Sequence, residues 1–388
     1  MYRFAITPQI QRDVEWLEDA NVRLGRNGVV ARRWAGRLRR ELQAGAIAAS
    51  SRMEGVPVDA DDTRRILAGD RPPSVASADA VMVEGYRDAV AHALSEAAHL
   101  GFAWSPRLVL DVHRIAMGAS ETAHAGTFRD HPVHVVDGSG IAVYTGPAAS
   151  HVAELVKELC AWMNAAAGTA APAAAALVHA RIAGIHLFSD GNGRCARILA
   201  TLAMWQGGYT LPEFTSLEEW WGEHPRSYYR AFQSLGDHWK DTADVTRFVA
   251  THVRAQRRQV AALAQRLSVE RHVWTALEDI AADDAALPPR ATEALFDAFH
   301  GRVVANRYYR DVTGVSVATA TNDLAALEDA RLIVASGEGR SRRYTGAFRL
   351  IALVAIAAHA PVLASADASL GQQRAVVLED LREQVLRR

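Results

Sequence analysis

The chain has little cysteine, almost no lysine and no long apolar run. Its two cysteines, Cys160 and Cys195, are too few for a disulfide framework or a zinc site, and they fit a reducing cytoplasm. The most hydrophobic run, residues 350–358, is too short to span a bilayer. The first residues, Met-Tyr-Arg-Phe-Ala-Ile-Thr-Pro, lack the apolar core of a signal peptide. These absences predict a soluble, cytoplasmic protein without a membrane segment.

The charges of the chain are nearly balanced, and the formal net charge is −1. No general attraction to nucleic acid or to a membrane surface is therefore expected. Lys157 and Lys240 are the only lysines, so the positive charge is nearly all arginine, and alanine is abundant. Such a skew suggests a GC-rich coding bias, which makes arginine richness weak evidence for any partner. With 388 residues the chain is long enough for two or three domains.

One stretch, His186 to Arg197, contains the groups needed to bind a metal-bound nucleotide. It is His-Leu-Phe-Ser-Asp-Gly-Asn-Gly-Arg-Cys-Ala-Arg, and it lies between residues 173–185 and 194–204, which both have helical periodicity. Glycine and asparagine favour turns that leave backbone N–H groups unpaired, and a helix N-terminus adds partial positive charge. Residues 191–194 therefore predict a phosphate site with His186 at the end of a buried helix.

Three side chains complete this predicted site. Arg194 and Arg197 are three residues apart on one helical face, so both guanidiniums can reach the same phosphate chain. Asp190 is the expected ligand for Mg²⁺, which takes one or two carboxylates together with the phosphates of its substrate. The flanking periodicity argues against an ordinary hairpin turn. A calcium loop is excluded because Arg194 and Thr201 stand where oxygen ligands are needed.

The stretch resembles the motif of Fic-domain proteins, His-x-Phe-x-Asp-Gly-Asn-Gly-Arg-x-x-Arg. Every defining position is present, with Leu187 where proline is common. The resemblance implies an enzyme that transfers AMP from ATP to a Tyr, Ser or Thr hydroxyl of a target protein. It assigns His186 as the general base and Asp190 as the Mg²⁺ ligand, and makes Phe188 a core anchor of the loop. The phosphate-binding residues that it implies are Gly191, Asn192, Gly193, Arg194 and Arg197.

A second motif precedes the first in the chain. Ser-Ser-Arg-Met-Glu-Gly ends a helical stretch, because Gly55 is a C-terminal stop and Pro57 prevents continuation. Ser50, Glu54 and Gly55 also match Ser-x-x-x-Glu-Gly, which resembles the inhibitory motif of some Fic proteins. That resemblance implies that Glu54 pairs with Arg197 in the place of the terminal phosphate, so that ATP binds in an unproductive pose.

The region from Gly126 to Gly146 has the alternating pattern of a β-hairpin rather than helical periodicity. As structure alone it is a surface hairpin. In Fic proteins a flap of this kind follows Gly-x-Phe-Arg, here residues 126–129, and positions the target by adding a strand. His131 and His134 lack a third ligand and are expected on the surface. Tyr228 and Tyr229 resemble a Tyr-Tyr pair that follows the core in this family; they are expected to pack, with an adenine contact as the alternative.

The C-terminal part differs from the rest. Helical stretches at residues 291–299, 308–313 and 316–330 precede a strand, turn and strand over residues 332–344, which is the pattern of a winged helix. It resembles the small winged domains fused behind bacterial Fic cores. The residues that would contact DNA are Thr319, Thr321, Asn322, Arg340, Arg342 and Arg343. Four acidic residues, Asp323, Glu328, Asp329 and Glu338, dilute this basic face, so protein binding or dimerisation is an equal alternative.

These patterns predict a mainly α protein with a Fic-type helical core, a small β-hairpin flap and a C-terminal winged-helix domain. The expected boundaries are residues 1–77 for the helical region with the inhibitory motif, 78–268 for the catalytic core, 269–350 for the winged helix and 351–388 for a helical tail. The predicted function is protein adenylylation with ATP and Mg²⁺, autoinhibited by Glu54. Two alternatives remain: removal of AMP by the same site, and DNA-binding regulation with a nucleotide-sensing core. The target protein and the formation of a homodimer are not determined by these residues.

Overall fold

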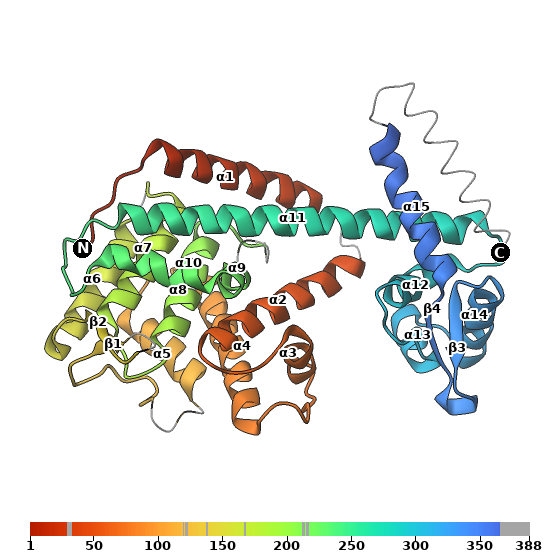
Figure 1. Cartoon of the computed structure of the whole chain (residues 1–388), viewed down its shortest axis with the longest axis horizontal. Helices are drawn as coiled ribbons and strands as arrows, with labels where there is room; N and C mark the ends of the chain where they lie inside the picture. The colour runs from red at the N-terminus through yellow and green to blue at the C-terminus, as the bar shows by residue number, and fades with distance from the viewer. Residues whose placement is uncertain are drawn as a thin grey trace. The chain divides into compact units, whose positions relative to one another are not determined.

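The computed structural model describes residues 1–28, 33–118, 120, 123–136, 139–166, 168–211, 214 and 217–364. Within these ranges the chain is mainly helical, as Figure 1 shows. The helices are α1 (Pro8–Gly28), α2 (Arg33–Met53), α3 (Ala60–Leu67), α4 (Ser77–Ala97), α5 (Pro106–Met117), α6 (Val152–Ala165), α7 (Ala171–Ile185), α8 (Asn192–Gln206), α9 (Leu217–Glu223), α10 (Pro225–Phe232), α11 (Thr246–Asp283), α12 (Thr292–Phe299), α13 (Asn306–Thr313), α14 (Val317–Asp329) and α15 (Phe348–Ala364). The strands form two antiparallel hairpins, β1 (His134–Val136) with β2 (Ala142–Thr145), and β3 (Ile333–Ser336) with β4 (Arg343–Gly346).

The chain divides into two compact units, Met1–Ala264 and Gln265–Arg388, and the boundary falls inside α11. The first unit includes both the N-terminal helices and the expected catalytic core. Helical periodicity over residues 245–267 predicts one long helix there, but α11 begins at Thr246 and continues to Asp283. The reason is that no glycine or proline interrupts residues 246–283, while apolar side chains such as Leu277 remain buried beyond the expected end. The division into four regions stays a prediction.

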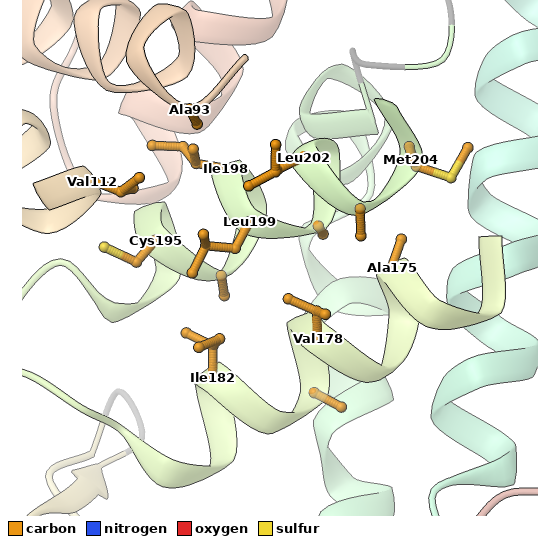
Figure 2. Packing of buried hydrophobic residues seen from close by; sticks show 14 of the residues in the cluster. Ala93, Val112, Ala175, Val178, Ile182, Cys195, Ile198, Leu199, Leu202 and Met204 are labelled. Carbon is orange, nitrogen blue, oxygen red and sulfur yellow. The ribbon is translucent and has the colours of Figure 1, made fainter. Parts of the chain in front are cut away.

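Helices α7 and α8 form the centre of the first unit. Figure 2 shows Ala175, Val178 and Ile182 of α7 pointing toward α8, while Ala93 of α4 and Val112 of α5 lie on the opposite side of α8. All of these side chains are buried, and each fully buried Val or Ile stabilises the fold by about 1.5–3 kcal/mol. The alanines of α7 have small side chains, which allows the backbones of neighbouring helices to approach closely. This packing fixes the first turn of α8 relative to the last turn of α7.

Local sequence accounts for the ends of α5. Ser105 accepts a hydrogen bond from the backbone N–H of Leu108, Pro106 occupies the first turn, and Gly118 follows the last residue. Helix α4 begins at Ser77, four residues before the predicted start at Val81.

In the second unit, the three helices and the hairpin occur in the expected order. Asp323 was expected to dilute a basic face, but it is 6% exposed and accepts two hydrogen bonds from Arg290, at 2.7 and 2.8 Å. Glu328 is paired with Arg342 at 2.6 Å. Two of the four acidic residues are thus neutralised within the unit. The side chain of Arg340 lies outside the described residues, and the assignment as a winged helix, like its DNA contact, stays a prediction.

None of the helices in the described ranges combines the length and apolar character needed to cross a bilayer.

Candidate active site

The predicted loop connects the end of α7 to the start of α8. His186 follows α7 with φ +54° and ψ +66°, and Gly191 precedes α8 with φ +78°. These left-handed conformations end one helix and start the next within a few residues. At Gly191 a Cβ atom would lie 2.7 Å from Sδ of Met117, so the close approach of α5 as well as the backbone angle demands glycine.

The side chain of Asn192 holds the loop closed from inside. Its Oδ1 accepts from the backbone N–H of Phe188 at 2.9 Å, and its Nδ2 donates to the carbonyl of Phe188 at 2.8 Å. Phe188 is fully buried, as expected for a core anchor. The side chain of Asn192 is therefore engaged within the loop, while its backbone N–H lies in the first turn of α8, where the contact with phosphate is expected.

His113 of α5 contacts the same loop through Phe188 and Asp190. Its ring stacks on Phe188 with centroids 3.6 Å apart. Nδ1 accepts from the backbone N–H of Gly126 at 2.9 Å, so the ring proton is on Nε2, which donates to the carbonyl of Asp190 at 3.1 Å. Burial lowers the pKa of His113 to about 4, which keeps the ring neutral. Nothing in the sequence distinguishes His113, since a lone histidine in an apolar helix has no distinctive pattern.

Arg129, from the Gly-x-Phe-Arg segment, binds the backbone at the opposite end of the loop. It is 4% exposed and donates to the carbonyls of His186 at 2.7 Å, His131 at 2.6 Å and Pro147 at 2.7 Å. One buried guanidinium thus joins the base of the flap region to the end of α7. The motif that predicts the flap contains Arg129, but its role as a link to His186 is visible only in the structure.

The imidazole of His186 is oriented as a general base requires. Its Nδ1 lies 3.3 Å from the carbonyl of Ala183, which can only accept, so Nδ1 carries the proton and Nε2 is left as an acceptor. Burial lowers the pKa of His186, and the nearby guanidinium of Arg129 lowers it further. The ring is therefore neutral at pH 7, the form that can accept a proton from a hydroxyl.

Both predicted arginines are buried on the first turns of α8, next to residues of the second motif. Arg197 donates from Nε to Oγ of Ser50 at 2.9 Å and from Nη2 to Oε1 of Glu54 at 2.7 Å. Nε of Arg194 lies 3.8 Å from Oε2 of Glu54 and has no hydrogen-bond partner among the described residues. A buried guanidinium with an unpaired donor fits a site for an anion that is larger than one carboxylate.

The carboxylate of Glu54 lies against the N-terminal turn of α8. A Cβ atom added to Gly193 would lie 2.5 Å from Oε1 of Glu54, so the absence of a side chain at this position makes room for the carboxylate. Burial by itself raises the pKa of Glu54, but the charges of Arg197 and Arg194 outweigh it and lower the pKa below its usual value. Glu54 is thus an anion bound where the sequence predicts phosphate.

Glycine at position 55 is required by the turn that places Glu54. Gly55 has φ +85°, a left-handed conformation, and its N–H donates to the carbonyl of Arg52 at 3.0 Å. Helix α2 therefore ends at Met53, next to the stop that the sequence predicts at Gly55.

Asp190 fits a magnesium ion that is shared with phosphates. Its side chain is 53% exposed, and its Oδ1 accepts from the backbone N–H of Gly191 at 2.6 Å. The other oxygen lies 3.9 Å from Nη2 of Arg194. No group of three His, Cys, Asp or Glu side chains that could hold a metal is present within the described ranges. One solvent-facing carboxylate beside an anion site suits Mg²⁺, which keeps waters and takes ligands from its substrate.

The two predicted tyrosines have different positions. Tyr228 is buried, and its hydroxyl accepts from Nη1 of Arg197 at 3.4 Å, whereas Tyr229 is 58% exposed. Tyr228 therefore packs against Arg197, one of the two arginines predicted to bind phosphate, in agreement with the packing role expected for it.

The predicted flap contains the β1–β2 hairpin, in which Val135 pairs with Tyr144. The hydroxyl of Tyr144 donates to the carbonyl of Gly184 at 2.8 Å, two residues before His186. Val136, Ile141 and Val143 are 46–64% exposed, while residues 137 and 138 of the flap lie outside the described residues. The hairpin is thus anchored beside the loop and has exposed apolar side chains, and its role in binding a target stays a prediction. His131 and His134 are on the surface, as expected.

Comparison with known proteins matches residues 103–204 to the model of the Fic/DOC family. The chain is 30% identical over 154 residues to protein adenylyltransferase fic-1 of Caenorhabditis briggsae, a match that covers 38% of this chain and 27% of that protein. It is 33% identical over 103 residues to protein adenylyltransferase Fic of Drosophila melanogaster, over 26% of this chain and 20% of the relative. The chain thus spans only about a quarter of the length of these relatives.

Solved structures show the same fold over a larger part of the chain. A Fic family protein from Desulfovibrio desulfuricans G20 has a TM-score of 0.59 at 20% identity and covers 90% of this chain and 98% of its own. Fic-1 of Caenorhabditis elegans, residues 134–508, has a TM-score of 0.53 at 21% identity over 66% of this chain and 72% of its own. The predicted Fic-type fold is therefore confirmed, while these identities are too low to transfer an activity.

Proposed function

We propose that this chain, in which residues 103–204 form a Fic/DOC family domain, transfers AMP from ATP to a Tyr, Ser or Thr hydroxyl of a protein. One observation carries the proposal: the neutral His186, with Nε2 free to accept, lies in the same loop as an anion site built from Gly193, Arg194 and Arg197. Relatives named protein adenylyltransferases match this part of the chain.

The residues of the loop have separate tasks in this reaction. His186 removes the proton of the incoming hydroxyl through Nε2, while the carbonyl of Ala183 orients the ring and Arg129 holds the backbone carbonyl of His186. Arg194, Arg197 and the first N–H groups of α8 bind the outer phosphates and stabilise the charge of the departing diphosphate. Mg²⁺ held by Asp190 would neutralise further phosphate charge. The hydroxyl oxygen forms a bond to the α-phosphorus, and the bond to the bridging oxygen of the diphosphate breaks.

We further propose that the described state is autoinhibited. Glu54 is paired with Arg197 and lies against Gly193, which are two of the groups assigned to the outer phosphates. A triphosphate must displace this carboxylate to reach both arginines, or bind in another pose. Because Glu54 is ionised, its displacement separates an ion pair that is largely shielded from water.

The test is transfer of label from ATP labelled at the α-phosphate, with Mg²⁺, in a Glu54→Gly background. We expect automodification that His186→Ala abolishes, while His99→Ala, which removes an exposed histidine beyond α4, leaves it unchanged. Binding of ATP by the His186→Ala variant, measured by calorimetry, should persist, because His186 is assigned to the proton rather than to the phosphates. Label that remains on the His186→Ala variant would exclude His186 as the base.

Hydrolytic removal of AMP from a modified protein is a second candidate, favoured by the presence of an ionised carboxylate at the site. Glu54 could orient a water for removal of AMP from a modified protein. The discriminating measurement is release of AMP from a protein that has first been modified by the Glu54→Gly variant. Release by the wild-type chain but not by the Glu54→Gly variant would favour removal.

A further inference from the structure

Behind the phosphate site, Arg197 is connected to a line of buried polar groups through Ser50. Nε of Arg197 donates to Oγ of Ser50 at 2.9 Å, and Ser50 is hydrogen-bonded to Tyr86. The hydroxyl of Tyr86 donates to Oε1 of Glu218 at 2.8 Å. Each of these side chains is at most 3% exposed, although they come from α2, α4, α8 and α9.

A second line of hydrogen bonds leaves the other side of the same guanidinium. Nη1 of Arg197 donates to the hydroxyl of Tyr228 at 3.4 Å, and Tyr228 is 3.1 Å from Nε2 of His179. Nδ1 of His179 is 3.1 Å from Nε2 of His252. Nδ1 of His252 is 3.1 Å from Nε2 of Gln256.

This second line has a definite direction. An amide nitrogen can only donate, so Nδ1 of His252 accepts from Gln256, and the ring proton of His252 is on Nε2. His252 therefore donates to His179, and His179 donates from Nε2 to Tyr228. Burial lowers the pKa of His252 to about 3 and that of His179 well below its usual value, so both rings are neutral with one donor and one acceptor. The oxygen of Tyr228 accepts from His179 and from Arg197.

The two lines end at one small cavity. It has a volume of about 20 Å³, and its lining includes Arg197, Glu218, Trp221 and Gln256. Oε2 of Glu218, Nε1 of Trp221 and Oε1 of Gln256 are buried and have no hydrogen-bond partner within the described part of the chain. Three unpaired polar atoms at one cavity are unusual, because buried polar groups are nearly always satisfied by protein or by water. A volume of this size accommodates about one water molecule.

The chemistry of the three atoms suits water. Burial raises the pKa of Glu218, and its Oε2 can hydrogen-bond a water either as a protonated donor or as an ionised acceptor. Trp221 can only donate, and Oε1 of Gln256 can only accept. A water molecule can accept from Trp221, donate to Gln256 and hydrogen-bond Oε2 of Glu218 in either protonation state, so one water satisfies all three atoms.

We propose that an internal water completes a closed ring of hydrogen bonds around this cavity, and that Glu218 and Tyr228 are positioning residues for Arg197. The ring occupies Nε and Nη1 of the guanidinium, while Nη2 donates to the anion, which in this structure is Glu54, and more distantly to the carbonyl of Ser50 at 3.5 Å. Its effect on ATP rests on the proposed function, in which Arg197 binds an outer phosphate. Without the ring, the guanidinium is free to rotate away from that phosphate.

The test compares the affinities of ATP and AMP, measured by calorimetry, in the Glu54→Gly background. Tyr228→Phe and Glu218→Leu should weaken ATP binding about tenfold, which corresponds to the loss of one hydrogen bond to a charged group. AMP lacks the outer phosphates, so each variant should bind AMP with an affinity within about twofold of that of its parent, the Glu54→Gly chain. Glu218→Gln retains a neutral donor and acceptor and should restore ATP binding, whereas a purely structural role predicts no difference between the two nucleotides. Glu223→Leu, at an exposed position of the same helix as Glu218, is the matched control.

Each result has a clear meaning. If the Glu54→Gly chain binds ATP no more tightly than AMP, the proposed function itself is overturned, independently of the results for the variants. If the parent prefers ATP but Tyr228→Phe keeps the same preference, the ring does not position Arg197. Tyr228→Phe removes a single oxygen and decides the question if Glu218→Leu does not fold. A high-resolution crystal structure should show water between Glu218, Trp221 and Gln256, and an empty cavity would refute the closed ring.

Discussion

Replacing Glu54 with glycine should activate the protein. The carboxylate accepts from Arg197 at 2.7 Å and lies 3.8 Å from Arg194, and its side chain is 18% exposed. A hydrogen bond between charged groups contributes about 1.5–3 kcal/mol, and 1.4 kcal/mol corresponds to about a tenfold change in an equilibrium constant. At ATP concentrations below saturation, Glu54→Gly should therefore raise automodification roughly 10- to 100-fold.

The assay is the initial rate of label incorporation from ATP labelled at the α-phosphate, as a function of ATP concentration. Glu54→Gln retains the shape of the side chain without its charge, so we expect an intermediate rate. Glu96→Gly is the control, because it removes an exposed carboxylate near the end of α4. Without nucleotide, Glu54→Gly should unfold at a lower temperature than wild type, because two buried guanidiniums lose their counter-charge. ATP should recover part of the loss by binding the folded state.

The pH dependence of stability tests the ion pair between Glu54 and Arg197. The folded-state pKa of Glu54 is lowered, so its contribution to stability is present above its ordinary pKa of about 4.5 and is lost as the pH falls below that value. The stability difference between wild type and Glu54→Gln should shrink accordingly in acid. An automodification rate for Glu54→Gly equal to that of wild type, in a preparation that still depends on His186, would refute the inhibitory role.

Three further outcomes follow from the loop. Burial lowers the pKa of His113 from 6.5 to about 4, so the neutral ring stabilises the fold above pH 6.5 and this contribution is lost toward pH 4. The free energy of unfolding should fall by about 3 kcal/mol across this range. In urea unfolding, His113→Gln should show a smaller dependence on pH than wild type. Asn192→Leu leaves two backbone groups of Phe188 unpaired and should cost about 2–4 kcal/mol in the same assay, whereas a loss below about 0.5 kcal/mol would show that the loop closes without them. Asp190→Asn should change the stability by less than about 0.5 kcal/mol, because the side chain is exposed, yet raise the Mg²⁺ concentration needed for half-maximal labelling.

Much of the architecture could be predicted from local pattern. The helix at residues 106–117 has a serine cap, a proline in its first turn and a terminal glycine, and these signals act within a few residues of each other. The flap was also predictable, because period-two alternation around a turn indicates a hairpin. Helix α11 was predicted too short, since the end of a helix without a breaker depends on what its last turns pack against.

The sequence by itself predicted the groups of the loop. Asp190, the glycines and the two arginines predict a metal ligand and an anion site, because a turn between two helices places them together, and the resemblance to Fic-domain proteins implies that His186 is the base. It also placed Ser50 and Glu54 in a motif, although they are more than a hundred residues from the loop.

Only the tertiary structure decided how those residues are held. His113 and Arg129 bind backbone groups of the loop, and backbone partners leave no pattern in a sequence. The buried ring behind Arg197 joins residues of seven helices, from Ser50 to Gln256, and nothing in their spacing relates one to another. Folding brings such groups together through packing of apolar faces, and the polar contacts that result depend on distances between helices rather than on distances along the chain.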